Sequence, residues 1–594
     1  MRYHISQSNW LIIPALLTVV GSVSGVAAHT TADIFDTKST SITLPPDPHF
    51  SQLAQLPNPI IPRTPEPPAP TLPPSQEQPL QPPAPTPPTP QQWPNIPGTI
   101  IVKKFVFEGN NAFSDEKLAE VTKQFTNRQV TFAEVLEAEA AITKLYTDAG
   151  YINSGAVIPV DQDPISPEGA VIKIQIIEGT IEDIRVRGTR RLNPGYVRSR
   201  LQLATSRPLN TNRLLRALQL LQLNPLIKNI SAELAAGSRP DRSILEVKVT
   251  EADSFDLQFF ADNGRSPSVG SFRRGVQIDQ GNLIGFGDSL RVVYTNTDGS
   301  NALDLSYTMP FNPRNGTIRL AGGLTSTNVI EPPFDRADIT GDSHYYELSL
   351  RQPVIQTPTK EFALGISASR QESQTTLLGE NYPLSPGADD EGRTRISAVR
   401  FVQEWTQRNP REVFAARSQF SVGIGAFDAT IHEEAPDSRF FAWRGQAQYV
   451  RLLAPETLLL LRSDVQLSNR ALVPLEQFGL GGFRSVRGYR QDALLTDNGV
   501  LASAEVQIPI YRLPRQQGVL QVIPFIDFGT AWSSSGRQNP DPNTLLGVGL
   551  GVQWRQGDRF IARFEYGIPL IEVDSSDRTL QEQGLYFSVQ YSPF

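Results

Sequence analysis

The sequence contains no cysteine, which excludes disulfides, thiol nucleophiles and thiolate metal sites. Histidine is also scarce, and no pair among the five histidines has the spacing of a metal site. Phosphate loops of the Gly-x-x-x-x-Gly-Lys-Ser/Thr type are absent, and so are the His-Glu-x-x-His and Gly-x-Ser-x-Gly motifs. We therefore expect no enzymatic activity, no catalytic residue, no metal and no cofactor, and any transport must run without ATP hydrolysis by this chain.

Long apolar runs are missing after the first 28 residues, and the mean hydropathy is -0.26. A membrane-spanning helix needs about 20 apolar residues. A protein with this pattern can cross a membrane only as a closed barrel, because helices and closed barrels alone satisfy their backbone hydrogen bonds in lipid. The net charge of -7 and the lack of a basic patch with interleaved aromatics argue against a nucleic-acid partner.

The first 98 residues read as a signal and a spacer. Residues 1–28 show a basic start, an apolar stretch from Trp10 to Val23 and the small-residue cleavage site Val26-Ala27-Ala28, a pattern typical of a secretory signal. The alternative is a membrane anchor, for which the apolar run is short. Residues 29–98 are proline-rich, with 21 prolines among the 53 residues from Pro45 to Pro97, so neither helix nor sheet can propagate there. We predict an extended spacer, with a ligand for a proline-binding domain as the alternative.

An internal repeat follows the proline-rich segment. Val102–Gly109 aligns with Ile181–Gly188 at an offset of 79 residues. Each copy reads as a strand, two helices and two strands, and the capping box Thr131-x-x-Glu134 marks the start of one helix. The sequence therefore predicts two α+β domains, at residues 99–178 and 179–252.

Residues 253–594 consist of segments of about ten residues in which apolar and polar side chains alternate. Connections after odd-numbered segments are mostly long and those after even-numbered segments mostly short, as in outer-membrane barrels with long external loops and short periplasmic turns. A soluble β-sandwich array explains neither the even count nor this asymmetry. We expect an all-β transmembrane barrel of 16 antiparallel strands in the outer membrane, with the two α+β domains in the periplasm. The sixteen segments lie near 254–263, 270–280, 287–297, 300–310, 315–325, 343–353, 360–371, 394–405, 413–425, 440–451, 456–467, 498–509, 519–530, 544–554, 559–568 and 584–594.

Two clusters in this region carry an unusual composition. The long connection 468–497 contains Gly481-Gly-Phe-Arg-Ser-Val-Arg-Gly-Tyr-Arg490, and such packed arginines, glycines and aromatics favour a loop that folds inward. In the segment Phe525-Ile-Asp-Phe-Gly529, Asp527 lies on the face opposite two apolar residues, and a charge there belongs in the polar lumen. We predict that Arg487 meets Asp527 inside the barrel. The alternative is that Arg487 stabilises the loop outside.

A third cluster, Gly547-Val-Gly-Leu-Gly551, could be read as a nucleotide loop. Glycine at every second position of a strand places all three on one face, however. The pattern therefore predicts a close approach of another backbone to that face.

These residues resemble known motifs. Val486-Arg487-Gly488-Tyr489 resembles the loop motif of the outer-membrane polypeptide-transporter and insertase superfamily, and Phe525-x-Asp527-x-Gly529 resembles its partner motif on the barrel wall. The repeats are similar to polypeptide-transport-associated (POTRA) domains. From about residue 100 to the end, the chain resembles two-partner secretion transporters of the haemolysin activator/secretion type. The resemblance implies a lumen motif formed by Arg484, Val486, Arg487, Gly488 and Tyr489, with Phe525, Asp527 and Gly529 as its partners on the wall.

The resemblance also implies a function: a translocator that recognises an unfolded partner polypeptide in the periplasm and secretes it through the barrel without nucleotide hydrolysis. The implied partners are that polypeptide, outer-membrane lipids and the barrel-assembly machinery, for which the last strand with Tyr591 and Phe594 resembles an insertion signal. A barrel insertase is the alternative, although insertases generally carry more periplasmic domains. A passive porin would not need the tandem domains. Such transporters usually have a plug helix, for which the one candidate lies around residues 50–56.

Overall fold

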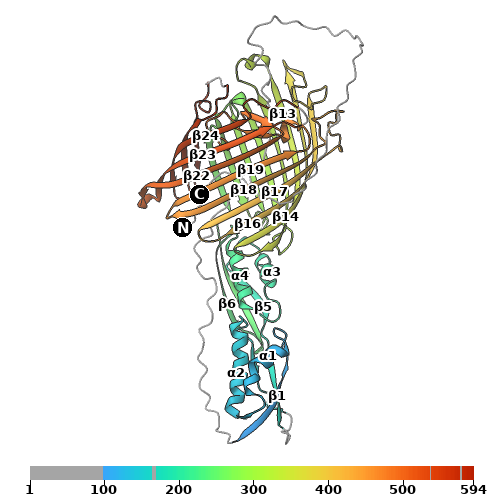
Figure 1. The fold of residues 1–594 in the computed structure, drawn as a ribbon, viewed down its shortest axis with the longest axis vertical. Coiled ribbons are helices and arrows are strands. Elements are labelled where there is room, and N and C mark those ends of the chain that lie inside the picture. Colours follow the sequence, from blue (N-terminus) through green and yellow to red (C-terminus); the bar gives the residue numbers. More distant parts are fainter. Residues whose placement is uncertain (1–97, 163–168, 535–536, 575–577) are drawn as a thin grey trace, which may run out of the picture.

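The computed structural model describes residues 98–162, 169–534, 537–574 and 578–594. The signal segment, the proline-rich segment up to residue 97 and the candidate plug helix at 50–56 lie outside these ranges. The described chain forms a stalk of two small α+β units that leads to a barrel (Figure 1). No helix in these ranges is long and apolar enough to cross a membrane.

The first α+β unit has a four-stranded sheet in the order β2-β1-β4-β3. Its elements are β1 (Thr99–Glu108), α1 (Asp115–Thr122), a 3-10 turn η2 (Lys123–Phe125), β2 (Gln129–Thr131), α2 (Phe132–Asp148), β3 (Gly155–Val157) and β4 (Ala170–Ile177). Helix α2 begins at the predicted capping box, in which Thr131 and Glu134 each accept a hydrogen bond from the other's backbone N–H. Val135, Ala138 and Ile142 lie on its buried face, as the helical spacing predicts.

The second unit repeats this arrangement with a three-stranded sheet in the order β5-β7-β6. Its elements are β5 (Thr180–Arg187), α3 (Pro194–Gln202), α4 (Thr211–Gln222), β6 (Ile227–Ala236) and β7 (Arg242–Glu251). In both units the first strand runs parallel to the last, and the strand just before the last pairs antiparallel with it. The predicted order of strand, two helices and two strands is therefore present in each unit. Strand β2, which lies between the two helices of the first unit, was not predicted.

Each unit ends in a glutamate that fixes the loop after its own first strand. Glu178 accepts hydrogen bonds from the backbone N–H groups of residues 111 and 112, both at 2.7 Å. Glu251 accepts from the three consecutive N–H groups of residues 190–192 at 2.7, 3.1 and 2.9 Å. Burial raises the pKa of the Glu251 carboxyl, but these backbone donors outweigh burial and hold its pKa below the usual range.

The barrel contains all sixteen predicted strands, closed into one antiparallel ring. A two-residue strand, β15 (Glu380–Asn381), extends the hairpin that follows β14. The ring closes where β26 pairs with β8. The sixteen strands are β8 (Phe255–Asp262), β9 (Arg273–Gly281), β10 (Ser289–Thr297), β11 (Ser300–Pro310), β12 (Thr317–Asn328), β13 (Thr340–Gln356), β14 (Lys360–Leu377), β16 (Arg393–Arg408), β17 (Glu412–Ile424), β18 (Phe441–Ala454), β19 (Thr457–Ser468), β22 (Asn498–Leu513), β23 (Gly518–Trp532), β24 (Thr544–Gln556), β25 (Phe560–Pro569) and β26 (Leu585–Tyr591).

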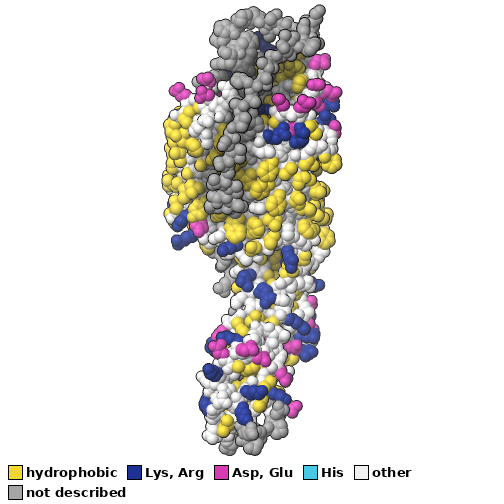
Figure 2. Space-filling view, turned by 45° about the vertical axis from the view of Figure 1, so that its right-hand side comes forward, with side chains coloured by type: hydrophobic (Ala, Val, Ile, Leu, Met, Phe, Trp, Pro, Cys, Tyr) yellow, Lys and Arg dark blue, Asp and Glu magenta, His cyan; other side chains and the backbone are white. Residues whose placement is uncertain are grey.

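Alternation along these strands separates an apolar outside from a polar inside. On β23, Ile526 and Phe528 are exposed on the outer face, whereas Asp527 is fully buried on the inner face. An apolar belt covers the barrel wall, with charged side chains beyond it at either end (Figure 2). Inside lies a cavity of 1970 Å³ lined by many charged residues, among them Arg351 and Glu404. The fold class predicted from the alternation is confirmed.

The two ends of the barrel differ as predicted. Turns such as 357–359 and 455–456 are short and lie at the end that faces the stalk, whereas long connections such as 378–392 and 425–440 lie at the other end (Figure 1). We call residues 469–497, between β19 and β22, the inward loop, because they fold into the barrel.

Polar contacts join the stalk units to each other and to the barrel. At the end of α2, the Gly150 carbonyl accepts a hydrogen bond from the backbone N–H of Thr211, the first residue of α4, at 2.9 Å. At the barrel, the Arg200 guanidinium of α3 donates to Asn315 Oδ1 at 2.7 Å, in the turn between β11 and β12. The turn between β9 and β10 contributes a further contact, because the Gly285 carbonyl accepts from the backbone of the second unit. The stalk is therefore attached to short turns of the first part of the barrel.

We predict that a fragment of residues 98–252 folds without the barrel, since each unit has its own core and capped helices. In this fragment, Thr131→Ala should lower the free energy of unfolding by about 1 kcal/mol, because the helix loses its N-cap acceptor. Urea denaturation followed by circular dichroism measures the change. Lys117→Ala, which removes an exposed ion pair with Glu120, is the control and should change the free energy of unfolding much less. A fragment without a cooperative transition would contradict the prediction.

The lowered pKa of Glu251 predicts a pH dependence for the same fragment. Its stabilising contribution is complete above the unfolded-state pKa of about 4.5 and is lost as the pH falls through the lower folded-state pKa. The free energy of unfolding should therefore drop more steeply below pH 4.5 in the wild type than in Glu251→Gln. Urea titrations between about pH 3 and 7 test this difference, and parallel curves for the two proteins would refute it.

Candidate functional site

The inward loop has a small core of its own. It forms a hairpin of β20 (Phe478–Leu480) and β21 (Leu494–Thr496). The first part of the loop packs through Leu472, Val473 and Leu475 against β16 and β18. Its later apolar residues form another buried cluster with wall residues, which holds the loop against the strands that follow it. The members of this cluster are Phe478, Leu480, Val486, Tyr489, Leu494, Leu501, Ala531 and Leu545.

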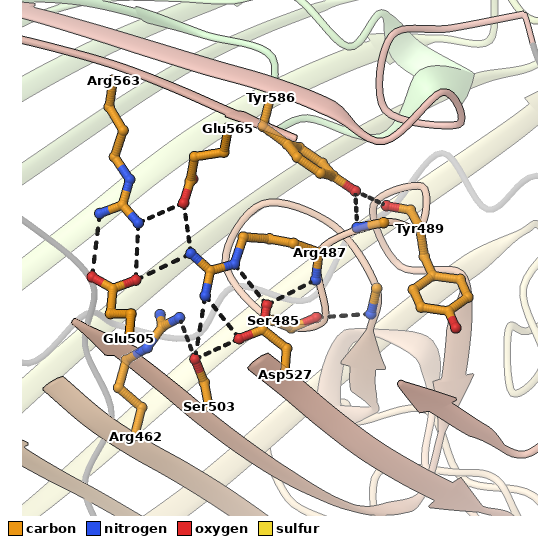
Figure 3. A network of polar contacts seen from close by, with 12 residues as sticks. Arg462, Ser485, Arg487, Tyr489, Ser503, Glu505, Asp527, Arg563, Glu565 and Tyr586 are labelled. Carbon is orange, nitrogen blue, oxygen red and sulfur yellow. Dashed lines mark hydrogen bonds and ion pairs between the residues drawn. The ribbon is translucent and has the colours of Figure 1, made fainter. Parts of the chain in front are cut away.

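Arg487 lies at the centre of the contact between loop and wall, with 1% of its side chain exposed. Its Nε donates to Asp527 Oδ2 at 2.6 Å and its Nη2 to Asp527 Oδ1 at 2.8 Å (Figure 3). The backbone N–H of Arg487 also donates to Asp527 Oδ2, at 3.1 Å. The structure thus places the two residues paired from the sequence in a bidentate, charge-assisted contact inside the barrel.

Two further carboxylates and a second arginine surround this pair. Arg487 Nη1 donates to Glu565 Oε1 at 2.6 Å and to Glu505 Oε2 at 3.1 Å. Arg563 Nη2 bridges the same two glutamates, at 2.5 Å from Glu565 and 2.9 Å from Glu505. We call Arg487, Asp527, Glu505, Glu565 and Arg563 the Arg487 cluster. Because its acids come from β22, β23 and β25, one loop residue connects three strands of the wall.

Arg462 of β19 completes the charge balance around the cluster. Its Nη2 donates to Ser503 Oγ at 3.1 Å, and Ser503 Oγ donates to Asp527 Oδ1 at 2.6 Å. Three arginines then face three carboxylates, so the formal charge of the group is zero. Buried charges are tolerated when they are paired and hydrogen-bonded, and removal of one partner from such a pair costs about 3–5 kcal/mol.

The spacing of the wall motif is explained by what each of its residues contacts. Phe525, Asp527 and Gly529 lie on one face of β23. The ring centroid of Phe525 lies 3.5 Å from the guanidinium carbon of Arg487, which fits a stacked cation–π contact. At Gly529 a Cβ atom would lie 3.0 Å from the Val486 side chain, so glycine leaves room for the loop. The three positions therefore stack on the arginine, pair with it and make space for its neighbour.

The next two loop residues, Gly488 and Tyr489, form hydrogen bonds with residues outside the loop. Gly488 has a φ of +106°, which favours glycine, and its N–H donates to Tyr586 Oη at 2.9 Å. Tyr586 Oη donates in turn to the Tyr489 carbonyl at 2.6 Å. Tyr489 Oη lies 3.0 Å from the Leu546 carbonyl and 2.9 Å from the Ile571 carbonyl. Each residue from 486 to 489 thus has a distinct contact with the wall.

The glycine-rich strand β24 provides the close approach that its pattern predicts. A Cβ atom at Gly547 would lie 1.9 Å from the Arg487 carbonyl oxygen, and one at Gly567 of β25 would lie 2.6 Å from the Gly488 nitrogen. The loop backbone therefore rests directly on the backbone of the wall, and a side chain at either position would push it away.

The other candidate residues lie elsewhere. Arg484 lines the main cavity. Tyr591 is exposed on the outer face of β26, and the ring of Phe594 lies 6.0 Å from that of Phe255. The assignment of Tyr591 and Phe594 to an insertion signal stays a prediction. Within the described residues, no group of three or more histidine and carboxylate side chains could hold a metal ion.

Sequence reasoning missed Glu505, Glu565, Arg563 and Tyr586. Each is a polar residue on the inner face of an alternating strand, and many inner-face residues of such a barrel are polar. The alternation along β22 places Glu505 on the inner face, together with Ser503 and Gln507. It did not reveal which strands come together around the loop.

Comparison with known proteins bears on these motifs. The family model of the haemolysin secretion/activation protein ShlB/FhaC/HecB matches residues 241–554, and the model of the ShlB-type POTRA domain matches residues 100–179. The chain belongs to this haemolysin secretion/activation family. It is therefore an outer-membrane translocator that acts with a secreted partner protein, and its POTRA domains lie in the periplasm.

The sequence identity between this chain and its individual relatives is low. The heme/hemopexin transporter protein HuxB of Haemophilus influenzae is 21% identical over 507 residues, which cover 79% of this chain and 83% of HuxB. The outer membrane protein assembly factor BamA of Nitratidesulfovibrio vulgaris is 25% identical over 499 residues, 79% of this chain but 59% of that protein. The solved structure of CdiB from Escherichia coli has the same fold, with a TM-score of 0.65 at 19% identity over 86% of this chain and 94% of that one.

We predict that Gly547→Ala displaces the inward loop of this haemolysin secretion/activation protein, because the added Cβ would overlap the Arg487 carbonyl. The barrel should still form, since its ladders do not involve the loop. Limited trypsin digestion of the purified protein reads out the loop, whose buried arginines become cleavable once it leaves the wall. Gly365→Ala in β14 is the matched control, because its Cβ would meet its nearest neighbour at 3.4 Å, an ordinary contact. Equal resistance of both variants would contradict the prediction.

Proposed function

We propose that this translocator accepts one unfolded partner polypeptide in the periplasm and conducts it through the lumen beside the inward loop. The observation that supports the proposal is the division of the lumen. The later part of the loop is held against β22–β25 by the Arg487 cluster, and its start is held by an ion pair between Glu476 and Arg400 of β16. The 1970 Å³ cavity is lined mainly by residues of β8–β19. A path for an extended chain therefore lies beside the loop, on the other side of the barrel.

The cavity lining suits an unfolded chain. Its charged side chains are largely engaged with one another, as in Arg351 with Glu404 at 2.7 Å and Arg444 with Asp464 at 2.7 Å. Paired charges leave little net charge on the wall to hold a passing segment. Transit then depends weakly on the side chains of the partner.

The finer assignments of partners and domains belong to the same proposal. We assign the signal to residues 1–28, the proline-rich extension to 29–98, the POTRA-like domains to 99–178 and 179–252, and the barrel to 253–594. The unpaired edges of β5 and β6 offer backbone groups to which an extended client can add a strand. Outer-membrane lipids contact the apolar belt, and the barrel-assembly machinery recognises the last strand through Tyr591 and Phe594.

The proposal predicts that Arg487→Ala and Asp527→Ala each leave an inserted barrel that secretes at least about tenfold less partner, because either change leaves a buried charge without its partner. Arg487→Lys should recover only part of the activity, since an ammonium group cannot form the bidentate contact. The partner is first identified as the protein missing from the culture supernatant of a deletion strain, and its amount is then measured for each variant.

Arg512→Ala is the matched control, because it removes an exposed arginine–glutamate pair with Glu456 far from the loop, and it should secrete normally. A double variant no worse than either single variant would support direct coupling between Arg487 and Asp527. Normal secretion by both single variants would refute the role of the cluster. Loss of many outer-membrane barrels from the deletion strain, instead of one secreted protein, would favour an insertase.

A further inference from the structure

The inward loop makes a second set of charged contacts, three residues after Arg487. Arg490 Nη2 lies 2.9 Å from Glu331 Oε2, and Arg490 Nη1 lies 3.4 Å from Glu582 Oε1. Glu331 belongs to the connection 329–339 between β12 and β13, and Glu582 to the connection between β25 and β26. One guanidinium therefore joins the inward loop to two other connections at the external end of the barrel.

Further hydrogen bonds beside Arg490 extend this set to another connection. The backbone N–H of Gln491 donates to Gln581 Oε1 at 2.8 Å. Gln581 Nε2 donates to the Arg265 carbonyl at 2.7 Å, in the connection 263–272 between β8 and β9. Arg578 Nη1 donates to the Pro332 carbonyl at 3.0 Å. Four connections thus meet through side chains that belong to no strand ladder.

The positions of these connections around the ring show where they meet. Strand β26 pairs with β8, and β9, β10 and β11 separate β8 from β12. Contacts between residues 331–332 and 578–582 therefore bridge strands that are not neighbours in the wall. Such contacts cross the external mouth of the barrel, and they oppose the exit of a polypeptide from the lumen.

The strength of these contacts differs from that of the Arg487 cluster. The Glu582 side chain is fully buried, and its Oε2 accepts from the N–H groups of Arg578 and Thr579 at 3.1 and 3.0 Å, so the acceptor is fixed in place. Arg490 is 28% exposed and Glu331 16%, however, against 1% for Arg487. Ion pairs open to water are weaker than buried ones. The contacts at the mouth can therefore open while the loop stays on the wall.

We propose that Arg490, Glu331 and Glu582 form an exit latch, which holds the external connections over the lumen and opens when the partner polypeptide leaves. Arg490 is a positioning residue in this latch. The inference rests on the proposed function in one respect, namely that the inward loop stays on the wall during conduction. The Arg487 cluster keeps the inward loop on the wall, and the exit latch keeps the external connections over the lumen.

Ion conductance of the purified full-length protein in planar lipid bilayers tests the latch without a partner. Arg490→Ala should raise the fraction of time spent conducting about fivefold, as expected for loss of a partly exposed pair. Glu331→Gln should act in the same direction, and the double variant should exceed neither single variant by much. Arg490→Lys should stay close to the wild type, since a single charge can still reach Glu331. Arg512→Ala is again the control and should conduct as the wild type does.

The absence of natural cysteine permits a rescue experiment. Arg490→Cys combined with Glu331→Cys should conduct like Arg490→Ala, and a short bis-maleimide that joins the two thiols should return conductance to the wild-type value. The joined protein should also stop secreting its partner in cells. Partner secretion at the wild-type rate through the joined protein would overturn the latch, and so would unchanged conductance in Arg490→Ala.

The two proposals can fail separately. Normal secretion by Arg487→Ala together with raised conductance in Arg490→Ala would refute the role of the Arg487 cluster and leave the latch in place. Loss of secretion in Arg490→Ala as severe as in Arg487→Ala, with no change in conductance, would overturn the latch and make Arg490 part of the loop's attachment to the wall.

Discussion

The buried guanidinium of Arg487, whose charge must be neutralised, determines where the inward loop lies in this barrel. Arg487 enters the lumen from a loop, and its charge is offset by carboxylates on three different strands. These three acids lie next to Arg487 in only one register of the strands. A slip of one residue would turn Asp527 from the lumen to the lipid face, where a charge is costly. The position of the loop therefore depends on the strand register that brings the acids of β22, β23 and β25 together.

The sequence was sufficient to predict features that repeat along the chain. Alternation and connection length predicted the sixteen strands and their orientation, because lipid and lumen impose different side chains on the two faces of every strand. The two stalk units followed from an internal repeat and a capping box at Thr131. Arg487 and Asp527 were found because both residues stand out locally: one lies among glycines and aromatics, and the other between Ile526 and Phe528.

What the sequence did not reveal depends on which strands come together. Ser503 lies opposite Asp527, and Asp527 lies opposite Gly547, so three residues from separate strands form one row beneath the loop. Nothing near Glu505 or Glu565 in the sequence distinguishes them from other polar residues of the lumen. Strand β2 was missed because its three residues are too few to show a period. The contacts of Arg490 were missed because they join connections, which carry no periodic pattern.

The attachment of the stalk has a mechanical consequence. Helix α2 meets the start of α4 end to end, and the second unit contacts the turns on either side of β10 and β11. A force applied at the far end of the stalk therefore acts as a torque on one arc of the ring. The Arg487 cluster fastens the inward loop to another arc, β22 to β25. Between the two arcs runs the ladder of β26 with β8, the shortest among the sixteen strands. Torque on the stalk therefore acts on the ring beside its shortest ladder.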